Sequence, residues 1–149
     1  MSVLIFVLSL FSVAFASDDS LNRTDLKCTG RAHHNVSLTA YYPVFGTDDK
    51  RNHLDERGES LNTLQDFLDG RNRYVTVAGN LRSGIPYGTK VCIEELNKHL
   101  GRRIPLEVRD QVDYGRDYLS PDLSSLEICV RTEEDTYDTY VNGLVTAYM

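Results

Sequence analysis

Short stretches in which apolar and polar residues alternate recur along this chain. Alternation with a period of two predicts β-strands, because successive side chains of a strand point to opposite faces of a sheet. In the stretch 104–109, for example, Ile104, Leu106 and Val108 alternate with Pro105, Glu107 and Arg109. The predicted strands are Val36–Tyr42, Tyr74–Ala78, Thr89–Glu94, Ile104–Asp110, Leu126–Arg131 and Leu144–Tyr148.

One segment has a helical pattern instead. Leu61, Leu64 and Leu68 recur at the spacing that places them on one face of a helix. Ser60 is a suitable N-cap and Gly70 a suitable terminator. These signals predict one short helix over 60–68, whereas the polar stretch 96–102 is interpreted as a connection.

Six short strands and one short helix predict an all-β fold, a small closed barrel. Closure is favoured because it removes the unpaired strand edges through which chains associate. The stretch Tyr74–Glu94 is central to this prediction, with Pro86-Tyr87-Gly88 as its turn. A plain β-hairpin is the alternative interpretation of that stretch.

The beginning of the chain has the pattern of a secretory signal peptide. Val3–Phe15 is almost entirely apolar, and Ala14-Phe15-Ala16 resembles a cleavage site. We therefore expect a signal peptide at 1–16, a leader segment at 17–35 and a barrel domain at 36–149. No later apolar run is long enough to span a bilayer, so we expect a secreted protein with no membrane contact after cleavage.

Composition narrows the range of ligands. The 149 residues carry a formal net charge of −6, and an acidic chain argues against nucleic acid as the partner. His33 and His34 are adjacent, so on an extended chain they point to opposite sides and do not share a metal ion. We expect neither a metal nor an organic cofactor.

An exported chain can form disulfides and carry glycans. The chain has three cysteines, Cys28, Cys92 and Cys129. Because three is an odd number, one thiol stays free or pairs between chains, and the sequence leaves the pairing open. Asn22 and Asn35 each begin a glycosylation sequon. Two long segments, Phe45–Ser60 and Gln111–Ser125, are candidate contact loops for a protein partner.

Several blocks, in their order along the chain, resemble the three-aspartate (3D) domain, and Ile85–Thr89 is the most specific of them. That domain is similar to the barrel part of lytic transglycosylase A and belongs with expansins and barwin among the double-psi β-barrels. The blocks are Thr39–Tyr42, Thr63–Leu68, Val75–Ala78, Ile85–Thr89, Val108–Asp110 and Leu126–Cys129.

The resemblance implies a six-stranded double-psi β-barrel that cleaves a cell-wall glycan of the peptidoglycan type. Asp110 matches the second family aspartate, while Asn80 and Glu127 stand at the positions of the first and third. In the family the third residue is the proposed catalytic acid. By this resemblance Glu127 is the acid and base, Asp110 its electrostatic partner, and Asn80 a hydrogen bonder to substrate.

Aromatic side chains complete the candidate site, because flat rings with polar tips suit sugars. Non-catalytic binding of carbohydrate or cell wall, and contact with a protein partner in the manner of a secreted effector, remain alternatives to cleavage. Packing within the barrel is the simpler interpretation of each tyrosine taken alone. The candidates for sugar stacking are Tyr41, Tyr42, Tyr87 and Tyr114.

Overall fold

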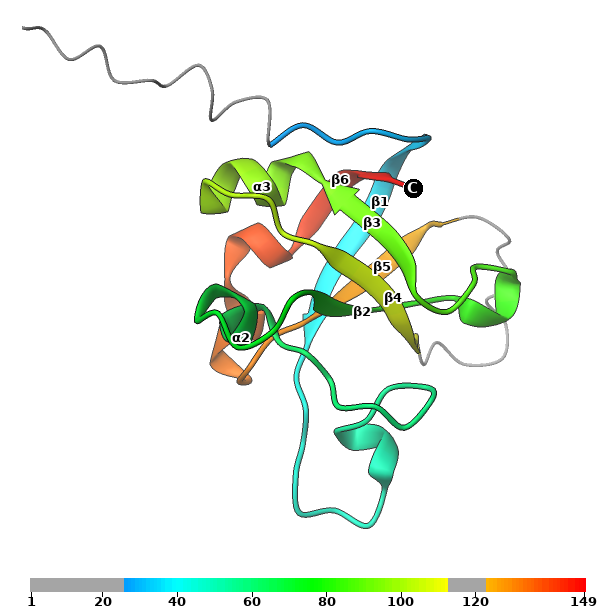
Figure 1. The fold of residues 1–149 in the computed structure, drawn as a ribbon, viewed down its shortest axis with the longest axis vertical. Coiled ribbons are helices and arrows are strands. Elements are labelled where there is room, and N and C mark those ends of the chain that lie inside the picture. Colours follow the sequence, from blue (N-terminus) through cyan, green and yellow to red (C-terminus); the bar gives the residue numbers. More distant parts are fainter. Residues whose placement is uncertain (1–25, 113–122) are drawn as a thin grey trace, which may run out of the picture.

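The computed structural model describes residues 26–112 and 123–149 as a closed six-stranded barrel (Figure 1). The order around the barrel is β1-β5-β2-β4-β3-β6. The all-β barrel prediction is therefore confirmed, and each predicted strand is present with shifted ends. The strands are β1 (Ala32–Tyr41), β2 (Val75–Gly79), β3 (Thr89–Ile93), β4 (Leu106–Gln111), β5 (Ser125–Cys129) and β6 (Gly143–Tyr148).

The strand pairing has an internal two-fold symmetry. Strands β1 and β5 pair in parallel, and so do β2 and β4, while the remaining neighbours are antiparallel. Replacing β1, β2 and β3 by β4, β5 and β6, and the reverse, reproduces every pairing with its direction. Two three-strand halves, related by this exchange, therefore close the barrel.

The barrel interior is filled by the apolar residues that alternate along each strand. Val77, Leu126 and Ile128 are fully buried, whereas Ser125 and Glu127, which alternate with the last two along β5, lie on the outer face. Burial of a large aliphatic side chain contributes about 1.5–3 kcal/mol. The alternation therefore fixes which residues remain outside to form a site.

The described residues form two α-helices, and both differ from expectation. Helix α2 (Leu64–Leu68) begins after Thr63, whose hydroxyl accepts from the amide of Asp66 at 3.1 Å, so Ser60 is not its N-cap. Helix α3 (Glu94–Leu100) occupies the stretch that was interpreted as a polar connection. The part of the chain that the structure describes also contains four short 3-10 turns: η1 (Lys50–Asn52), η2 (Leu81–Ser83), η3 (Glu134–Tyr137) and η4 (Thr139–Val141).

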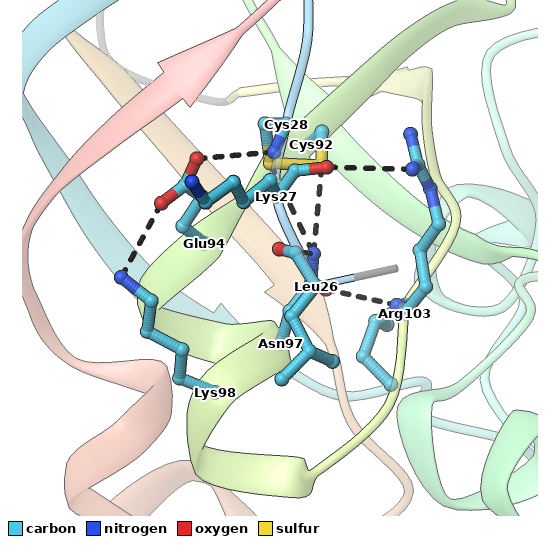
Figure 2. The surroundings of a disulfide bond; sticks show 9 residues. Leu26, Lys27, Cys28, Cys92, Glu94, Asn97, Lys98 and Arg103 are labelled. Carbon is cyan, nitrogen blue, oxygen red and sulfur yellow. Dashed lines mark hydrogen bonds and ion pairs between the residues drawn. A yellow bond between two sulfur atoms is a disulfide. The ribbon is translucent and has the colours of Figure 1, made fainter. Parts of the chain in front are cut away.

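A disulfide joins Cys28 to Cys92, with Cα atoms 5.6 Å apart, and Cys129 is a buried free thiol. Figure 2 shows how α3 supports this bond. The carboxylate of Glu94 accepts from the amide of Cys28 at 3.1 Å, and Asn97 donates to the carbonyl of Leu26. The end of the expected leader is thus attached to the barrel, and β1 begins at Ala32 rather than Val36.

The remaining predictions about export fall partly outside the described residues. The signal peptide and Asn22 lie there, whereas Asn35 is exposed at an irregularity of β1, with φ of 57°. Among the residues that the structure describes, no helix is long and apolar enough to cross a membrane.

Candidate functional site

A cleft of about 460 Å³ opens on the outer face of the barrel, between the strands and the segment 42–60. That segment extends away from the barrel after β1 (Figure 1). Asp110 and Glu127, the two predicted acids, both line the cleft. They come from different strands, β4 and β5, and the fold brings them to one opening.

Strand register explains why the two acids share this face. Ala78 of β2 is the direct partner of Asp110 on one side and of Glu127 on the other. Directly paired residues point to the same face of a sheet, and neighbouring strands lie roughly 4.8 Å apart, so the Cα atoms of the acids are about 10 Å apart. Since the side chain of Ala78 is only a methyl group, the space between the two acids stays open.

A β-bulge makes this register possible. Val77 pairs with Val108 and Ala78 with Asp110, so Arg109 is the extra residue of β4. Without it, Arg109 would stand opposite Ala78 and Asp110 would turn toward the other face. The bulge therefore places the carboxylate of Asp110 in the cleft.

Asp110 is half-buried and accepts two hydrogen bonds. Tyr41 donates its hydroxyl to Oδ2 at 3.0 Å, and the amide of Gln111 donates to Oδ1 at 2.9 Å. Both bonds favour the carboxylate, but burial outweighs them and raises the pKa of Asp110 above its ordinary value. Asp110 therefore keeps its proton to a higher pH than an exposed aspartate does.

The tyrosines divide between two roles. Tyr41 lines the cleft, but its hydroxyl is bound to Asp110, and burial first, then the nearby Cys129 and Asp110, raise the pKa of Tyr41 well above its ordinary value. Tyr42 also lines the cleft and packs against the core. Tyr114 lies outside the described residues.

Tyr87 supports the wall of the cleft. It donates its hydroxyl to Oδ2 of Asp55, and the guanidinium groups of Arg57 and Arg109 lie 4.1 and 5.2 Å from its ring centroid. Burial, followed by the bond to Asp55, raises the pKa of Tyr87 to about 12. The position predicted to stack on sugar thus joins the segment 42–60 to the barrel.

Asp55 is a site residue that the sequence interpretation missed. It is 6% exposed, lines the cleft, and accepts at Oδ1 from the amides of Arg57 and Glu59 at 2.9 Å each. Gly58, three residues later, has φ of 82°, and its amide donates a hydrogen bond to the carbonyl of Asp55. An aspartate followed at this spacing by glycine is a turn signal that could have identified it.

Asn80 stands at the border of the cleft. Its side-chain oxygen Oδ1 accepts from the side-chain nitrogen Nε2 of Gln111 at 3.5 Å, and Gln111 lines the cleft. It precedes η2, whose Arg82 also lines the cleft. The predicted substrate contact is therefore beside the two acids, separated from the opening by Gln111.

Within 26–112 and 123–149, no group of three or more His, Cys, Asp or Glu side chains is arranged to hold a metal ion. Comparison with models of protein families, with curated protein sequences and with solved structures returns no match. The geometry of the cleft is therefore the basis on which a function can be proposed.

Proposed function

We propose that this chain is an exported domain that cleaves a polysaccharide in the cleft containing Asp110 and Glu127. The observation that carries the proposal is that these two acids flank Ala78 on one face and line one opening. Pairs of carboxyl groups on either side of a scissile bond are the usual equipment of enzymes that cleave glycosidic bonds. The disulfide and the signal-peptide pattern support export.

The raised pKa of Asp110 favours it as the proton donor. This reverses the roles that the family resemblance implies, in which Glu127 is the acid. Asp110 protonates the bridging oxygen as its bond to the sugar carbon breaks. Glu127 stabilises the positive charge that develops on the sugar and takes a proton from the nucleophile.

The nucleophile determines the product. Attack by water gives hydrolysis, whereas attack by the sugar's own 6-hydroxyl closes an anhydro ring, as the family resemblance implies. The cleft volume of about 460 Å³ falls in the usual range for sites that bind small molecules. Tyr42 adds an aromatic face at its edge.

The test incubates the protein with purified peptidoglycan and with chitin, and the soluble products are identified by mass spectrometry. We expect release of fragments that is lost in Asp110→Asn and reduced in Glu127→Gln. Glu134→Gln is the matched control, because Glu134 is exposed and does not line the cleft. Equal activity in all three variants would refute the assignment of the acids.

A non-catalytic glycan-binding module is the second candidate. It is favoured by Asn80, which stands at an acidic family position and cannot supply negative charge. Retention of the wild-type protein on the polymer without any product would support this module over an enzyme. If the protein released no product and was not retained on the polymer, a protein partner would be favoured. The exposed side chains of Val44 and Phe45, beside the cleft, are the natural contact for such a partner.

A further inference from the structure

A second cleft, of about 590 Å³, lies where β4 begins, beside β3 and β6. Three cationic side chains line it, those of Arg73, Lys90 and Arg103, and all three residues are exposed. Their gathering at one hollow contrasts with the net charge of −6 of the whole chain. This cleft shares no lining residue with the one that contains Asp110.

These three cations differ from others on the surface. Arg71, Lys98 and Arg131 each form an ion pair with a carboxylate. Among the described residues, none of the three cations of the second cleft has a carboxylate within ion-pair distance. Arg103 donates to a backbone oxygen, that of Lys27, at 3.5 Å (Figure 2).

The acidic side chain of this cleft, Glu107, does not neutralise them. It is the register partner of Lys90, but its carboxylate binds Arg109 at 2.7 Å. Arg109 in turn lies over Tyr74, with its guanidinium carbon 4.3 Å from the ring centroid. The charge of Glu107 is therefore balanced by Arg109, and the cations of the second cleft remain available to a ligand.

Two tyrosines, Tyr74 and Tyr148, line the cleft beside the cations, and both are half-buried. A ring with a polar tip suits the face of a sugar, and cations bind the anionic groups that some sugars carry. A small inorganic anion would use the cations but not the rings.

We propose that the second cleft binds a negatively charged polysaccharide, with the three cations contacting its anionic groups and the two tyrosines its sugar rings. This proposal does not depend on cleavage in the first cleft. It assigns to the chain a separate binding site that would hold it on an anionic polymer.

The test measures binding of dextran sulfate and of uncharged dextran, which differ in charge, by titration calorimetry in about 0.15 M salt. We expect binding of dextran sulfate alone, weakened at higher salt. Combined substitution R73Q/K90Q/R103Q should weaken it by about tenfold or more. The matched control, K50Q/R71Q/K98Q, removes the same total charge outside both clefts and should leave affinity within about twofold.

Tyr148→Leu separates a sugar site from a simple anion site. It should weaken dextran sulfate binding without changing the response to inorganic sulfate. Equal losses of dextran sulfate affinity in the two triple variants would refute the proposal, because binding would then depend on net charge and not on this cleft. Equally tight binding of poly-glutamate through the same cations would also refute it, by pointing to an acidic protein partner. Asp110→Asn should retain dextran sulfate binding even if it has lost cleavage.

Discussion

Asp110 is the residue at which burial and hydrogen bonding oppose each other most clearly. Tyr41 and the amide of Gln111 stabilise its carboxylate, while the surrounding barrel and loop remove it from water. Burial is the larger effect and raises its pKa. A residue whose charge the fold disfavours is a candidate for function, since nothing in packing requires an acid there.

Asp110→Asn should therefore stabilise the folded protein at neutral pH. A raised folded-state pKa means that the native state holds the proton more tightly than the unfolded chain, so ionisation destabilises the native state above that pKa. As pH falls below the ordinary value of 3.8, both states become protonated and the advantage of the variant disappears. Urea unfolding of both proteins across this range measures the free energy of unfolding.

Asp49→Asn is the control, because the pKa of Asp49 is shifted in the opposite direction. The hydrogen bond from the Arg51 side chain lowers the pKa of Asp49, so its charge is favoured in the native state. That variant should gain nothing at neutral pH. Equal behaviour of the two variants would contradict the assignment of burial as the cause at Asp110.

The strand pattern placed Glu127 at an outward position, between the inward Leu126 and Ile128, and Glu127 lines the cleft. The same alternation, counted from Ile104, would place Asp110 on the inward face, and only the bulge at Arg109 turns Asp110 into the cleft. Asp55 was missed because its burial depends on Tyr87, which is 32 positions away in the chain. A charged loop carries no sequence signal for such a distant contact.

Among the elements, strands were predictable and helix α3 was not. Each strand carries its own alternation, but α3 has only Leu96 and Leu100 as large apolar residues and no polar N-cap, since Ile93 occupies that position. Helix α3 is held in place instead by hydrogen bonds that Asn97 forms outside the helix. Asn97 is fully buried, accepts from the amide of Ile104 at 2.9 Å and donates to the carbonyl of Leu26 at 3.1 Å.

Asn97→Ala should accordingly destabilise the protein by about 1–3 kcal/mol, the usual effect of leaving buried polar groups unsatisfied. Lys98→Ala, one position away and exposed, should change stability by roughly 0.5 kcal/mol or less. Chemical denaturation of the two variants provides the comparison. A similar small effect in both would mean that Asn97 does not hold α3 in place.

At the scale of the whole molecule, the disulfide fixes the start of the chain to the barrel. Cys28 and Cys92 are 64 positions apart, and a cross-link over so long a loop contributes typically about 2–4 kcal/mol. Replacing both cysteines by serine should lower the free energy of unfolding by that amount. The native wild-type protein should show no reactive thiol, and one per chain, Cys129, after unfolding.

Cys129→Ala tests the same pairing from the other side. It retains the disulfide, so it should show no thiol reactivity even after unfolding. A reactive thiol in that variant would mean that Cys28 and Cys92 are not joined. The odd number of cysteines predicted that one of them is free or pairs between chains but left its identity open, because the pairing depends on how the strands are arranged.

Two contacts attach the segment 42–60 to the barrel: the amide of Glu56 donates to the carbonyl of Arg109 at 3.1 Å, and Tyr87 binds Asp55. The hydroxyl of Tyr87 binds one oxygen of Asp55, whose other oxygen organises the amides of Arg57 and Glu59. Tyr87→Phe removes that hydroxyl while keeping the ring under Arg57. The segment should then open more often, so the amides of Arg57 and Glu59 should exchange hydrogen faster, by about five- to thirteenfold for a bond of roughly 1–1.5 kcal/mol.

Tyr140→Phe is the matched control, because Tyr140 also donates its hydroxyl to an aspartate, Asp138, away from the cleft. It should leave exchange at Arg57 and Glu59 unchanged. Because Asp49, Asn52 and Glu56 form the outer wall of the cleft, faster opening in Tyr87→Phe should also weaken any ligand held there. Ligand affinity that is unaffected despite faster exchange would place the binding surface on the barrel strands alone, with the segment 42–60 as a cover rather than a wall.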